Sequence, residues 1–329
     1  MSELGALGEF GLIKTLVGGL QGTEGVLCGP GDDCAVVQFG NARVLLSCDA
    51  MIEGIHFRRD WATPESIGWK AAAAALSDIA AMGGVARCML ITLGCPGDTD
   101  TEYLSRLYAG IAELTSQFNV AVVGGDTVRS AQGILLDITV VGELEEGKAP
   151  RYRSGAQPGD LVAVTGYPGC SGLGLAALLR GDKSPITLIE AHTRPRPRLA
   201  EGAWLARETA VHAMIDISDG TAADLHHIAE RSDVCISVER HKLPLSQEMQ
   251  HYAQEIGCRC EDYALSGGED YELAMTVAPE QATDLCKRFT EKFDLPLTCI
   301  GTVTSGAVQV LVDGQPVQRE GYDHFAAGK

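Results

Sequence analysis

The sequence predicts an α/β protein with two domains. Its 329 residues are 45% apolar, which is enough for about two cores of ordinary size. Strand-like and helix-like patterns alternate through both halves, and 39 glycines are spread along the chain, as tight strand–helix turns require. Only 21% of the residues are charged, which is not the composition of a disordered or fibrous chain.

The first half is expected to alternate strands with helices. Apolar runs predict strands at 43–50, 87–94, 120–127 and 134–144. The strand at 120–127 contains two glycines, which predict a turn within it. An alanine-rich helix is predicted over 65–83, where Gly83 and Gly84 end it, and a second helix over 101–118.

A polar segment at 145–160, rich in glycine and proline, predicts a domain boundary. We therefore expect one domain over 1–145 and a second over 146–329. Further strands are predicted at 161–166, 235–240, 271–277 and 297–303, with helices at 173–181, near 246–257 and near 280–292. The run 308–319 predicts a hairpin that turns at Asp313 and Gly314.

Charge and hydropathy exclude two classes of partner. The formal charge is −18, and the basic cluster at 194–198 is short and interrupted by prolines, so we expect no nucleic-acid partner. No apolar run reaches the roughly 18 residues of a membrane span, and the first residues lack the basic start of a signal peptide. We therefore expect no membrane partner and a cytoplasmic location.

The eleven cysteines predict reduced, non-catalytic side chains. Their spacing is irregular, their number is odd and no Cys-x-x-Cys occurs. Cys258 and Cys260 form the closest pair but have no partner pair at zinc-finger spacing. Cysteine is also a good small apolar residue for a core in a reducing compartment.

The positions of the acidic residues are the most informative feature. They follow glycine turns or end apolar strands, and one lies in an apolar helix: Asp32, Asp33, Asp49, Asp78, Asp126, Asp216, Asp219, Glu269 and Asp270. Any one of them could cap a helix or shape a turn. Asp78 is different, because an aspartate between Leu76 and Ile79 in a helix is costly to bury without a partner.

As a set, these carboxylates predict a magnesium site. Two carboxylates about 4 Å apart repel by roughly 4 kcal/mol at the effective dielectric constant of a protein. Lysine and arginine are absent from the segments that carry the acids, so divalent cations would have to supply the positive charge. Oxygen ligands without histidine or cysteine favour Mg²⁺, which also binds substrate phosphates and so lets an acidic protein bind a nucleotide.

The stretch AMIDISDGTAADL at 213–225 places two aspartates three residues apart in an apolar run. Side chains three apart in a strand point to opposite faces, so the pair can converge only if the strand ends between them. We expect the strand to end near Ile217, with Ser218 or Asp219 capping the next helix and Asp216 and Asp219 converging at the turn. The N–H groups at the start of that helix would suit a phosphate.

Neither of two common nucleotide-binding motifs fits the chain. The chain has no G-x-x-x-x-G-K-[ST] segment, so it is not a P-loop enzyme. GLGLAA at 172–177 matches the dinucleotide pattern, with Glu190 at the distance of a ribose-binding acid. A turn intervenes between the preceding strand and this motif, however, and the segment before Glu190 does not resemble a strand.

The motifs together resemble the thiamine-monophosphate kinase family, within the superfamily that includes aminoimidazole ribonucleotide synthetase. They cover nearly the whole chain in the order GEFGLI, GPGDDCAV, SCDAMIEGIHF, LSDIAAMGG, VVGGDT, RSGAQPGD, DISDG, LSGGEDYEL and GYDHF. The resemblance implies a two-domain aminoimidazole ribonucleotide synthetase-like α/β (α+β) fold. In that fold, an N-terminal domain with a mixed sheet pairs with its copy in a homodimer, and a C-terminal α+β domain follows.

The same resemblance implies ATP-dependent phosphorylation of thiamine monophosphate to thiamine diphosphate, with several Mg²⁺ ions and no covalent nucleophile. The metal ligands that it implies are Asp33, Ser47, Cys48, Asp49, Asp78, Asp126, Asp216 and Asp219. The residues implied to contact ATP are Tyr108, Gly125, Asp126, Arg153 and Ser218. Those implied to contact thiamine monophosphate are His56, Glu269 and Arg319.

Two positions depart from the family pattern. Cys48 stands where relatives usually have threonine, so a ligand from the backbone carbonyl would survive the change and a hydroxyl ligand would not. Arg319 lies near the place where many relatives carry an aromatic residue that stacks on the thiamine ring; arginine can also stack. His56 beside Phe57 could, on the residues alone, be a packed histidine.

Two other functions remain open from the sequence. A relative of the same superfamily could use ATP to activate an amide or carbonyl oxygen, and ADP release with candidate acceptors would distinguish it. A catalytically silent module that binds Mg²⁺ and nucleotide is the second alternative. For the kinase, direct in-line transfer is expected, because the acceptor phosphate is already ionised and needs no strong base.

Overall fold

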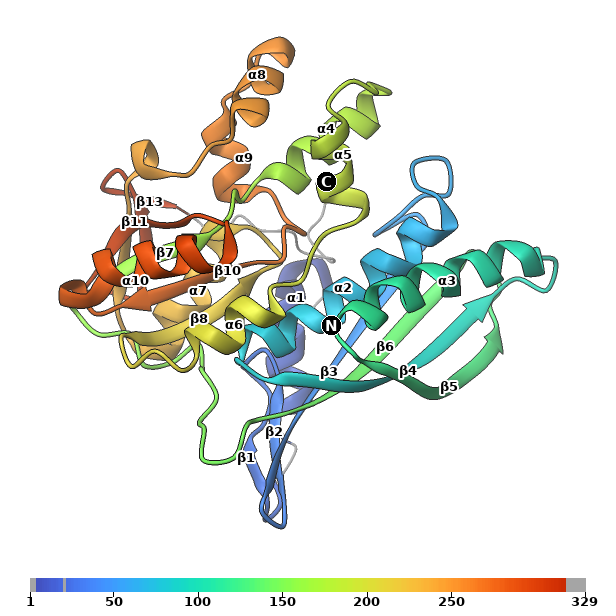
Figure 1. Ribbon diagram of the computed structural model, residues 1–329, viewed down its shortest axis with the longest axis horizontal. Helices are drawn as coiled ribbons and strands as arrows, with labels where there is room; N and C mark the ends of the chain where they lie inside the picture. Colours follow the sequence, from blue (N-terminus) through green and yellow to red (C-terminus); the bar gives the residue numbers. More distant parts are fainter. Residues whose placement is uncertain (1–3, 20–21, 318–329) are drawn as a thin grey trace.

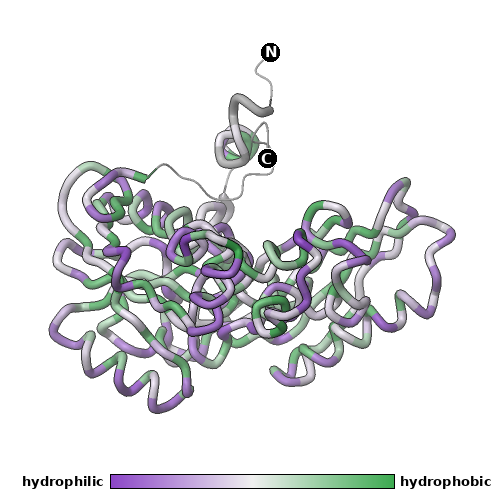
Figure 2. The backbone as a smooth tube through the Cα atoms, turned by 90° about the horizontal axis from the view of Figure 1, so that it is seen from above, coloured by the Kyte–Doolittle hydropathy of each residue, from purple (hydrophilic) through white to green (hydrophobic). Residues whose placement is uncertain are grey.

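The computed structural model describes residues 4–19 and 22–317, and two sheets form its framework (Figure 1). The first sheet has the order β1-β2-β3-β6-β4-β5 and the second the order β13-β12-β9-β11-β7-β10-β8. Viewed from above, the sheets and their helices form two lobes side by side, each containing apolar stretches (Figure 2).

The first sheet is antiparallel except between β4 and β5, which run parallel and are joined by α3. Its strands are β1 (Val26–Cys28), β2 (Ala35–Phe39), β3 (Ala42–Ile52), β4 (Val85–Cys95), β5 (Ala121–Arg129) and β6 (Leu135–Glu143). The helices of this half are α1 (Leu4–Val17), α2 (Pro64–Ala81) and α3 (Thr101–Gln117). Helices α2 and α3 lie over one face of the sheet (Figure 1).

The second sheet is antiparallel except between β12 and β9. Its strands are β7 (Leu161–Thr165), β8 (Val211–Ile217), β9 (Cys235–Val238), β10 (Glu272–Val277), β11 (Leu297–Thr304), β12 (Gln309–Val312) and β13 (Gln315–Val317). The helices are α4 (Cys170–Arg180), α5 (Ile186–Thr193), α6 (Leu199–Leu205), α7 (Thr221–Ser232), η1 (Arg240–Lys242), α8 (Gln247–Ile256), α9 (Cys260–Ser266) and α10 (Pro279–Phe293). A mostly antiparallel sheet excludes a dinucleotide-binding Rossmann unit, and Glu190 lies in α5 rather than after a strand.

Helix α2 is the central element of the molecule. Thr63 caps it by accepting a hydrogen bond from the Ser66 N–H, and all its residues except Glu65 and Asp78 are buried. The run of alanines keeps the helix narrow, so backbone atoms of neighbouring elements approach it closely. A Cβ on Gly202 of α6 would fall 2.1 Å from the carbonyl oxygen of Ala80. The largest hydrophobic core therefore joins residues of both halves.

Most of the predicted elements are confirmed. The alanine-rich helix, the helix after 101, the main strands and the hairpin at Asp313 and Gly314 all occur, and both turn residues have positive φ. No helix or strand interrupts the segment between β6 and β7. The division of the chain at residue 145 stays a prediction.

The turn predicted inside 120–127 is wrong, because β5 extends from Ala121 to Arg129 and only its register with β4 shifts, between Val122 and Gly124. Its glycines serve another purpose: a Cβ on Gly125 would lie 1.8 Å from the carbonyl oxygen of Ile91 on β4. Asp126 consequently lies within the strand, not at its end. Asp49 likewise lies inside β3, which continues to Ile52.

Within the described ranges, no helix has both the length and the apolar character that crossing a bilayer requires. All eleven cysteines are free thiols.

Candidate active site

Three carboxylates from distant parts of the sequence meet where the two sheets approach each other. Asp33 precedes β2, Asp78 lies on α2 and Asp216 lies near the end of β8, and their oxygen atoms are all within 4.8 Å of one another. Asp33 is 7% exposed and Asp216 is 3% exposed. The structure thus brings together three of the residues that were predicted to bind metal.

Neighbouring hydroxyl groups orient two of these carboxylates. Ser47 of β3 donates a hydrogen bond to Asp78, and Ser77 donates to Asp216 Oδ2 at 2.7 Å. Ser47 and Asp49 point to the same face of β3, since strand side chains alternate. Asp49 also shares a hydrogen bond with Asp78 and so joins the cluster as a fourth carboxylate.

Burial and neighbouring carboxylates raise the pKa values of Asp49, Asp78 and Asp216. Burial raises the pKa of Asp216 to about 7, with Asp33 adding to the rise. Burial raises the pKa of Asp49 to about 6, and burial together with Asp49, Asp216 and Asp33 raises the pKa of Asp78 well above its ordinary range. The cluster holds protons unless positive charge replaces them.

The donor set fits a hard divalent cation. Asp33 Oδ2 and Asp49 Oδ2 are buried side-chain oxygens without a hydrogen-bond partner in the described part of the chain. Unpaired buried carboxylate oxygens are costly, and a cation that takes oxygen ligands would satisfy them. Carboxylate and hydroxyl oxygens suit hard divalent cations such as Mg²⁺, Ca²⁺ and Mn²⁺.

One positive charge does reach the cluster, although none was found in the segments that carry the acids. Arg153, from the segment between the sheets, places its Nη2 2.6 Å from Asp33 Oδ1, and its backbone N–H donates to Asp32. Its side chain remains 18% exposed. The guanidinium therefore balances Asp33 from one side and could face a ligand phosphate on the other.

The turn after β8 differs from the prediction. The strand ends at Ile217 as expected, but neither Ser218 nor Asp219 caps α7; Gly220 occupies that position. Asp224, from within the helix, reaches back and accepts the N–H groups of Ser218, Asp219 and Gly220. A residue four to six positions further along thus takes over the role of the cap.

Asp216 and Asp219 fall into two different groups of side chains. Asp219 belongs to a second group with Asp224 and His227, while Asp216 belongs to the group with Asp33 and Asp78. The two groups are still close to each other. Burial is the main cause that raises the pKa of Asp224, and the charges of Asp219 and Asp216 raise it further. The predicted ligand role of Asp219 would therefore have to be exercised from this second group.

The structure keeps Cys48 away from the carboxylates. Its thiol points to the other face of β3, where it donates to Asp137 Oδ1 at 3.1 Å. The Cys48 thiol therefore cannot be the predicted metal ligand. Only the backbone carbonyl of Cys48 could serve in that role. This explains how the chain can carry cysteine in place of threonine.

The residues predicted to contact ATP are spread over both halves. Asp126 is exposed on the edge strand β5, where it accepts the N–H of Thr127 at 2.8 Å, and it is not part of the carboxylate cluster. Tyr108 lies on α3 and packs against the large core. Ser218 lies at the end of β8, with its carbonyl accepting the N–H of Glu269 at 2.7 Å.

His56 and Glu269, the residues predicted to contact thiamine monophosphate, are brought together by Lys70. The ammonium of Lys70 donates to Glu269 Oε2 at 2.8 Å and to the His56 carbonyl at 3.3 Å. Sequence reasoning missed Lys70, although a lysine next to Trp69 in an otherwise apolar alanine helix is the same signal that singled out Asp78. The His56 imidazole accepts the N–H of Ile52, so it is held in place rather than packed in the core.

The loop that carries Glu269 is conformationally unusual. Glu269 has φ 61° and Tyr271 has φ 53°, both in the left-handed region that side chains other than glycine rarely adopt. Between them, Asp270 accepts the N–H groups of Gly169 and Ser171 at the start of α4. Such strain persists where the surroundings determine the backbone, as at binding sites.

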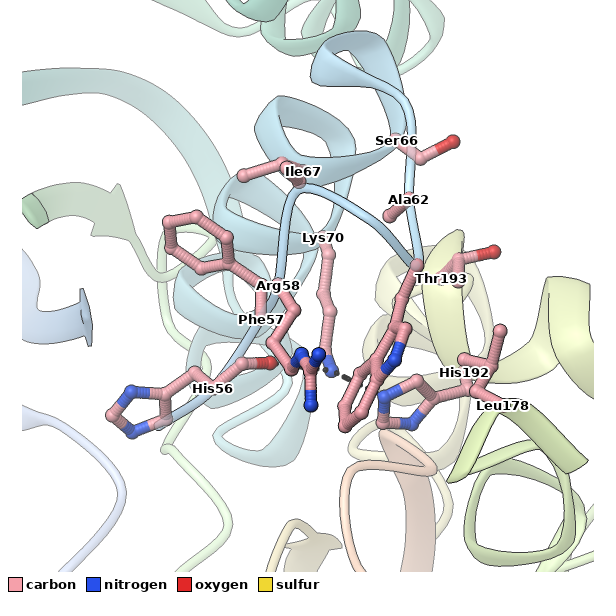
Figure 3. A pocket seen from close by; sticks show the side chains of 11 residues that line it. His56, Phe57, Arg58, Ala62, Ser66, Ile67, Lys70, Leu178, His192 and Thr193 are labelled. Carbon is pink, nitrogen blue, oxygen red and sulfur yellow. Dashed lines mark hydrogen bonds between the residues drawn. The ribbon is translucent and has the colours of Figure 1, made fainter. Parts of the chain in front are cut away.

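A pocket opens beside these residues (Figure 3). It is a shallow depression that is open to solvent, and its wall is aromatic and apolar with basic groups at intervals. The lining residues are His56, Phe57, Arg58, Trp61, Ala62, Ser66, Ile67, Lys70, Leu178, His192 and Thr193. Arg319 and the motif at 321–325 lie outside the described residues.

Comparison with known families fits this architecture. The family model "AIR synthase related protein, N-terminal domain" matches residues 31–144, and the model "AIR synthase related protein, C-terminal domain" matches residues 157–314. The fold and the carboxylate site thus define an AIR synthase related protein. The hydrogenase maturation protein HypE in complex with ATP shares the fold, with a TM-score of 0.69 at 19% identity.

More similar relatives show which family of AIR synthase related proteins the chain belongs to. The thiamine-monophosphate kinase of Aquifex aeolicus is 37% identical over 327 residues, covering 98% of this chain and all of that protein. The Bacillus subtilis enzyme is 35% identical and covers 96% and 99% of the two chains. The solved structure described as AaThiL complexed with AMPPCP and TMP superposes with a TM-score of 0.86 at 36% identity, covering 98% of this chain and 99% of that one. The chain belongs to the thiamine-monophosphate kinase family.

Proposed function

We propose that this chain phosphorylates thiamine monophosphate to thiamine diphosphate with ATP. The observation that carries the proposal is the buried carboxylate cluster with two unpaired oxygens, Asp33 Oδ2 and Asp49 Oδ2, in a chain of this family. Two anionic phosphates must be brought together in such a reaction. A site lined by several carboxylates can bind two phosphates only if cations neutralise the negative charge.

The residues that would hold Mg²⁺ are Asp33, Asp49, Asp78 and Asp216, with Ser47 orienting Asp78. Bound Mg²⁺ would neutralise phosphate oxygens and position the transferred group. Asp126, Asp219 and the Cys48 carbonyl complete the proposed ligand set from the surrounding strands. Several ions are proposed because these ligands are too dispersed for a single ion.

The acceptor would lie between His56 and Glu269, beside the pocket of Figure 3. Burial would raise the pKa of Glu269, but the charge and the hydrogen bond of Lys70 act in the opposite direction, and the pKa lies below its ordinary value. The carboxylate is therefore ionised. Arg319 is proposed as a further contact of the thiamine ring. The chain needs no covalent nucleophile, since the terminal phosphate of the acceptor is itself the attacking group in direct in-line transfer.

For ATP, Arg153 is proposed as the contact that balances phosphate charge, because its guanidinium is oriented by Asp33 and remains partly exposed. Gly125, Asp126 and Ser218 would contact the nucleotide through backbone and side-chain atoms. Tyr108 is the remaining proposed contact.

The proposal includes a homodimer formed by the first domain, residues 1–145, with residues 146–329 as the second domain. Every residue of the edge strand β5 is exposed, and Leu90 and Val123 are 42% and 59% exposed. A bare edge and an apolar open face are costly in water and are usually covered. The proposed location is the cytoplasm, where ATP is available and thiols stay reduced.

The decisive experiment is transfer of label from γ-labelled ATP in the presence of Mg²⁺, with thiamine monophosphate, free thiamine and buffer as parallel acceptors. Label in thiamine diphosphate, dependent on thiamine monophosphate, is the expected result. Label trapped on a protein side chain during turnover would overturn direct transfer. ATP binding without thiamine diphosphate formation would overturn the acceptor while leaving the metal site intact.

A further inference from the structure

Lys70 is a buried lysine whose hydrogen-bonding capacity is fully used. Its side chain is 4% exposed, and its ammonium carries three N–H groups. Three acceptors surround it: Glu269 Oε2 at 2.8 Å, the His56 carbonyl at 3.3 Å and His192 Nε2 at 3.3 Å. Figure 3 shows the side chain extending from α2 toward the His192 ring.

The partner His192 is neutral and has a defined tautomer. Burial and the Lys70 charge lower the pKa of His192 to about 4. An ammonium can only donate, so Nε2 must accept and Nδ1 must carry the proton. That Nδ1–H group faces the Ser171 hydroxyl at 3.0 Å, and Glu269 Oε2 is 3.6 Å away. The imidazole therefore holds the lysine from α5 and is itself held from α4.

Stability alone does not account for a charge at this position. Five alanines follow Lys70 on α2, and an apolar side chain there would avoid the cost of removing an ammonium from water. Buried ion pairs contribute little net stability compared with well-packed apolar residues. The lysine instead fixes a position. Its ion pair joins helix α2 in the first half of the chain to the strained loop at 269–271 in the second half.

We propose that Lys70 is the positioning residue of the acceptor site, the space between His56 and Glu269. It fixes the Glu269 carboxylate relative to the His56 backbone, so that the distance between these two residues stays constant. This inference rests on the proposed function, since it concerns the acceptor of that reaction. Lys70 has no spare N–H for the acceptor and acts through Glu269 and His56. Its loss should therefore impair acceptor binding far more than nucleotide binding.

The test compares Lys70→Met with Lys287→Met in steady-state kinetics. Methionine keeps the length and removes the charge, and Lys287 is a 74% exposed lysine near Glu291 on α10. In Lys70→Met, the KM for thiamine monophosphate is expected to rise by about tenfold or more, the loss typical of a charged hydrogen bond. The KM for ATP should change by less than about twofold. Lys287→Met should leave both constants unchanged.

A Lys70→Arg variant adds a charge-conserving comparison. Arginine retains the ion pair with Glu269 but not the compact arrangement of three donors, so its KM for thiamine monophosphate should lie between those of the wild type and Lys70→Met. If Lys70→Met does not fold, as judged by circular dichroism, His192→Leu provides the test. It keeps the lysine, removes one of its acceptors and should raise the same KM by about threefold.

The outcomes separate this inference from the proposed function. A wild-type protein that forms no thiamine diphosphate overturns both. An active wild type, together with a Lys70→Met variant whose KM for thiamine monophosphate is unchanged, overturns the positioning role alone. Equal increases in the KM for ATP and for thiamine monophosphate would also overturn it, because they would indicate a general structural role.

Discussion

Burial raises the pKa of Asp78 well above its ordinary range, and the carboxylates of Asp49, Asp216 and Asp33 raise it further. In Asp78→Asn, a neutral side chain of the same shape takes the place of a carboxyl that the metal-free protein already keeps protonated. Folding without metal should therefore be unchanged or stabilised. Turnover should fall by at least about 100-fold, since a cation ligand is lost.

Thermal unfolding and ADP formation measured on the same preparation would check this prediction. Asp284→Asn on α10 is the matched control, because that carboxylate is 69% exposed and pairs only with neighbouring Arg288 among the described contacts. Substantial activity in Asp78→Asn would contradict the role of Asp78 in the metal site.

The same carboxylates predict how stability depends on pH. The pKa values of Asp49 and Asp216 rise from 3.8 to about 6 and about 7 on folding. Between about pH 4 and pH 7, the folded chain thus binds more protons than the unfolded chain, and the metal-free protein loses stability as pH rises. Added Mg²⁺ replaces those protons. It should raise the unfolding temperature more at about pH 8 than at about pH 5.

Differential scanning calorimetry with and without Mg²⁺ at the two pH values would measure this effect, with Ca²⁺ as a test of ion preference. A shift on adding Mg²⁺ that is as large at acid pH as at alkaline pH would show that the ion does not compete with protons at these carboxylates.

Sequence reasoning at the residue scale succeeded where a side chain contradicted its surroundings. Asp78 is polar in an apolar helix, and Asp33, Asp49 and Asp216 share that conflict with neighbouring apolar runs. It failed where the role of a residue depends on a partner that is distant in the sequence. The contact between Lys70 and Glu269 spans 199 positions, and no local pattern predicts it. The role of Asp224 was missed for another reason: its three N–H donors lie only four to six residues earlier, but capping rules place the acceptor before the helix and not inside it.

At the scale of elements, the crossing of α2 and α3 depends on two glycines. A Cβ on Gly68 would lie 2.0 Å from the carbonyl oxygen of Leu107, and one on Gly110 would lie 1.8 Å from that of Glu65. Gly68→Ala should lower the free energy of unfolding by roughly 3 kcal/mol, because backbone rather than a flexible side chain must move. Urea denaturation would measure it.

Ala109→Gly is the control for this crossing, since Ala109 is exposed on α3. It should cost about 1 kcal/mol through helix propensity alone. If alanine at position 68 were neutral or stabilising, the close approach of the two helices would not constrain the fold.

Elements with a long, regular pattern were predictable, and the short helices α5 and α6 were not. The alanine run of α2 and the apolar run of β6 can each be recognised within one segment of the sequence. Helices α5 and α6 have seven or eight residues and are separated by a proline-rich stretch, so their stability comes from packing against α2 and α4. The glycines of β5 were misread as a turn because the strand they approach lies elsewhere in the chain.

At the scale of the whole molecule, the open face of the first sheet predicts association. The register between β4 and β5 shifts between the pairs Met89–Val122 and Leu90–Gly124, which leaves Val123 without a partner on β4. The Val123 side chain is 59% exposed, and Leu90 beside it on β4 is 42% exposed. Val123→Glu places a charge there and should convert the proposed dimer into a monomer. Light scattering coupled to gel filtration would measure the mass.

Val308→Glu is the matched control, since Val308 is 42% exposed and lies outside the first sheet. It should leave the mass unchanged. A Val123→Glu protein that keeps the mass of the wild type would exclude this face as the dimer contact.

Helix α2 carries Lys70 near its middle and Asp78 near its end, eight residues further on. Along a helix that separation is about 12 Å, and the buried helix cannot stretch or bend to change it. Helix α2 thus fixes the distance between the acceptor site and the carboxylate cluster. Substitutions in the pocket can alter which ring is accepted, but not how far its phosphate must reach. Inserting even one residue between the two positions would turn one of them by about 100° around the helix axis. Acceptor length is therefore the property of this enzyme that point substitutions would change least.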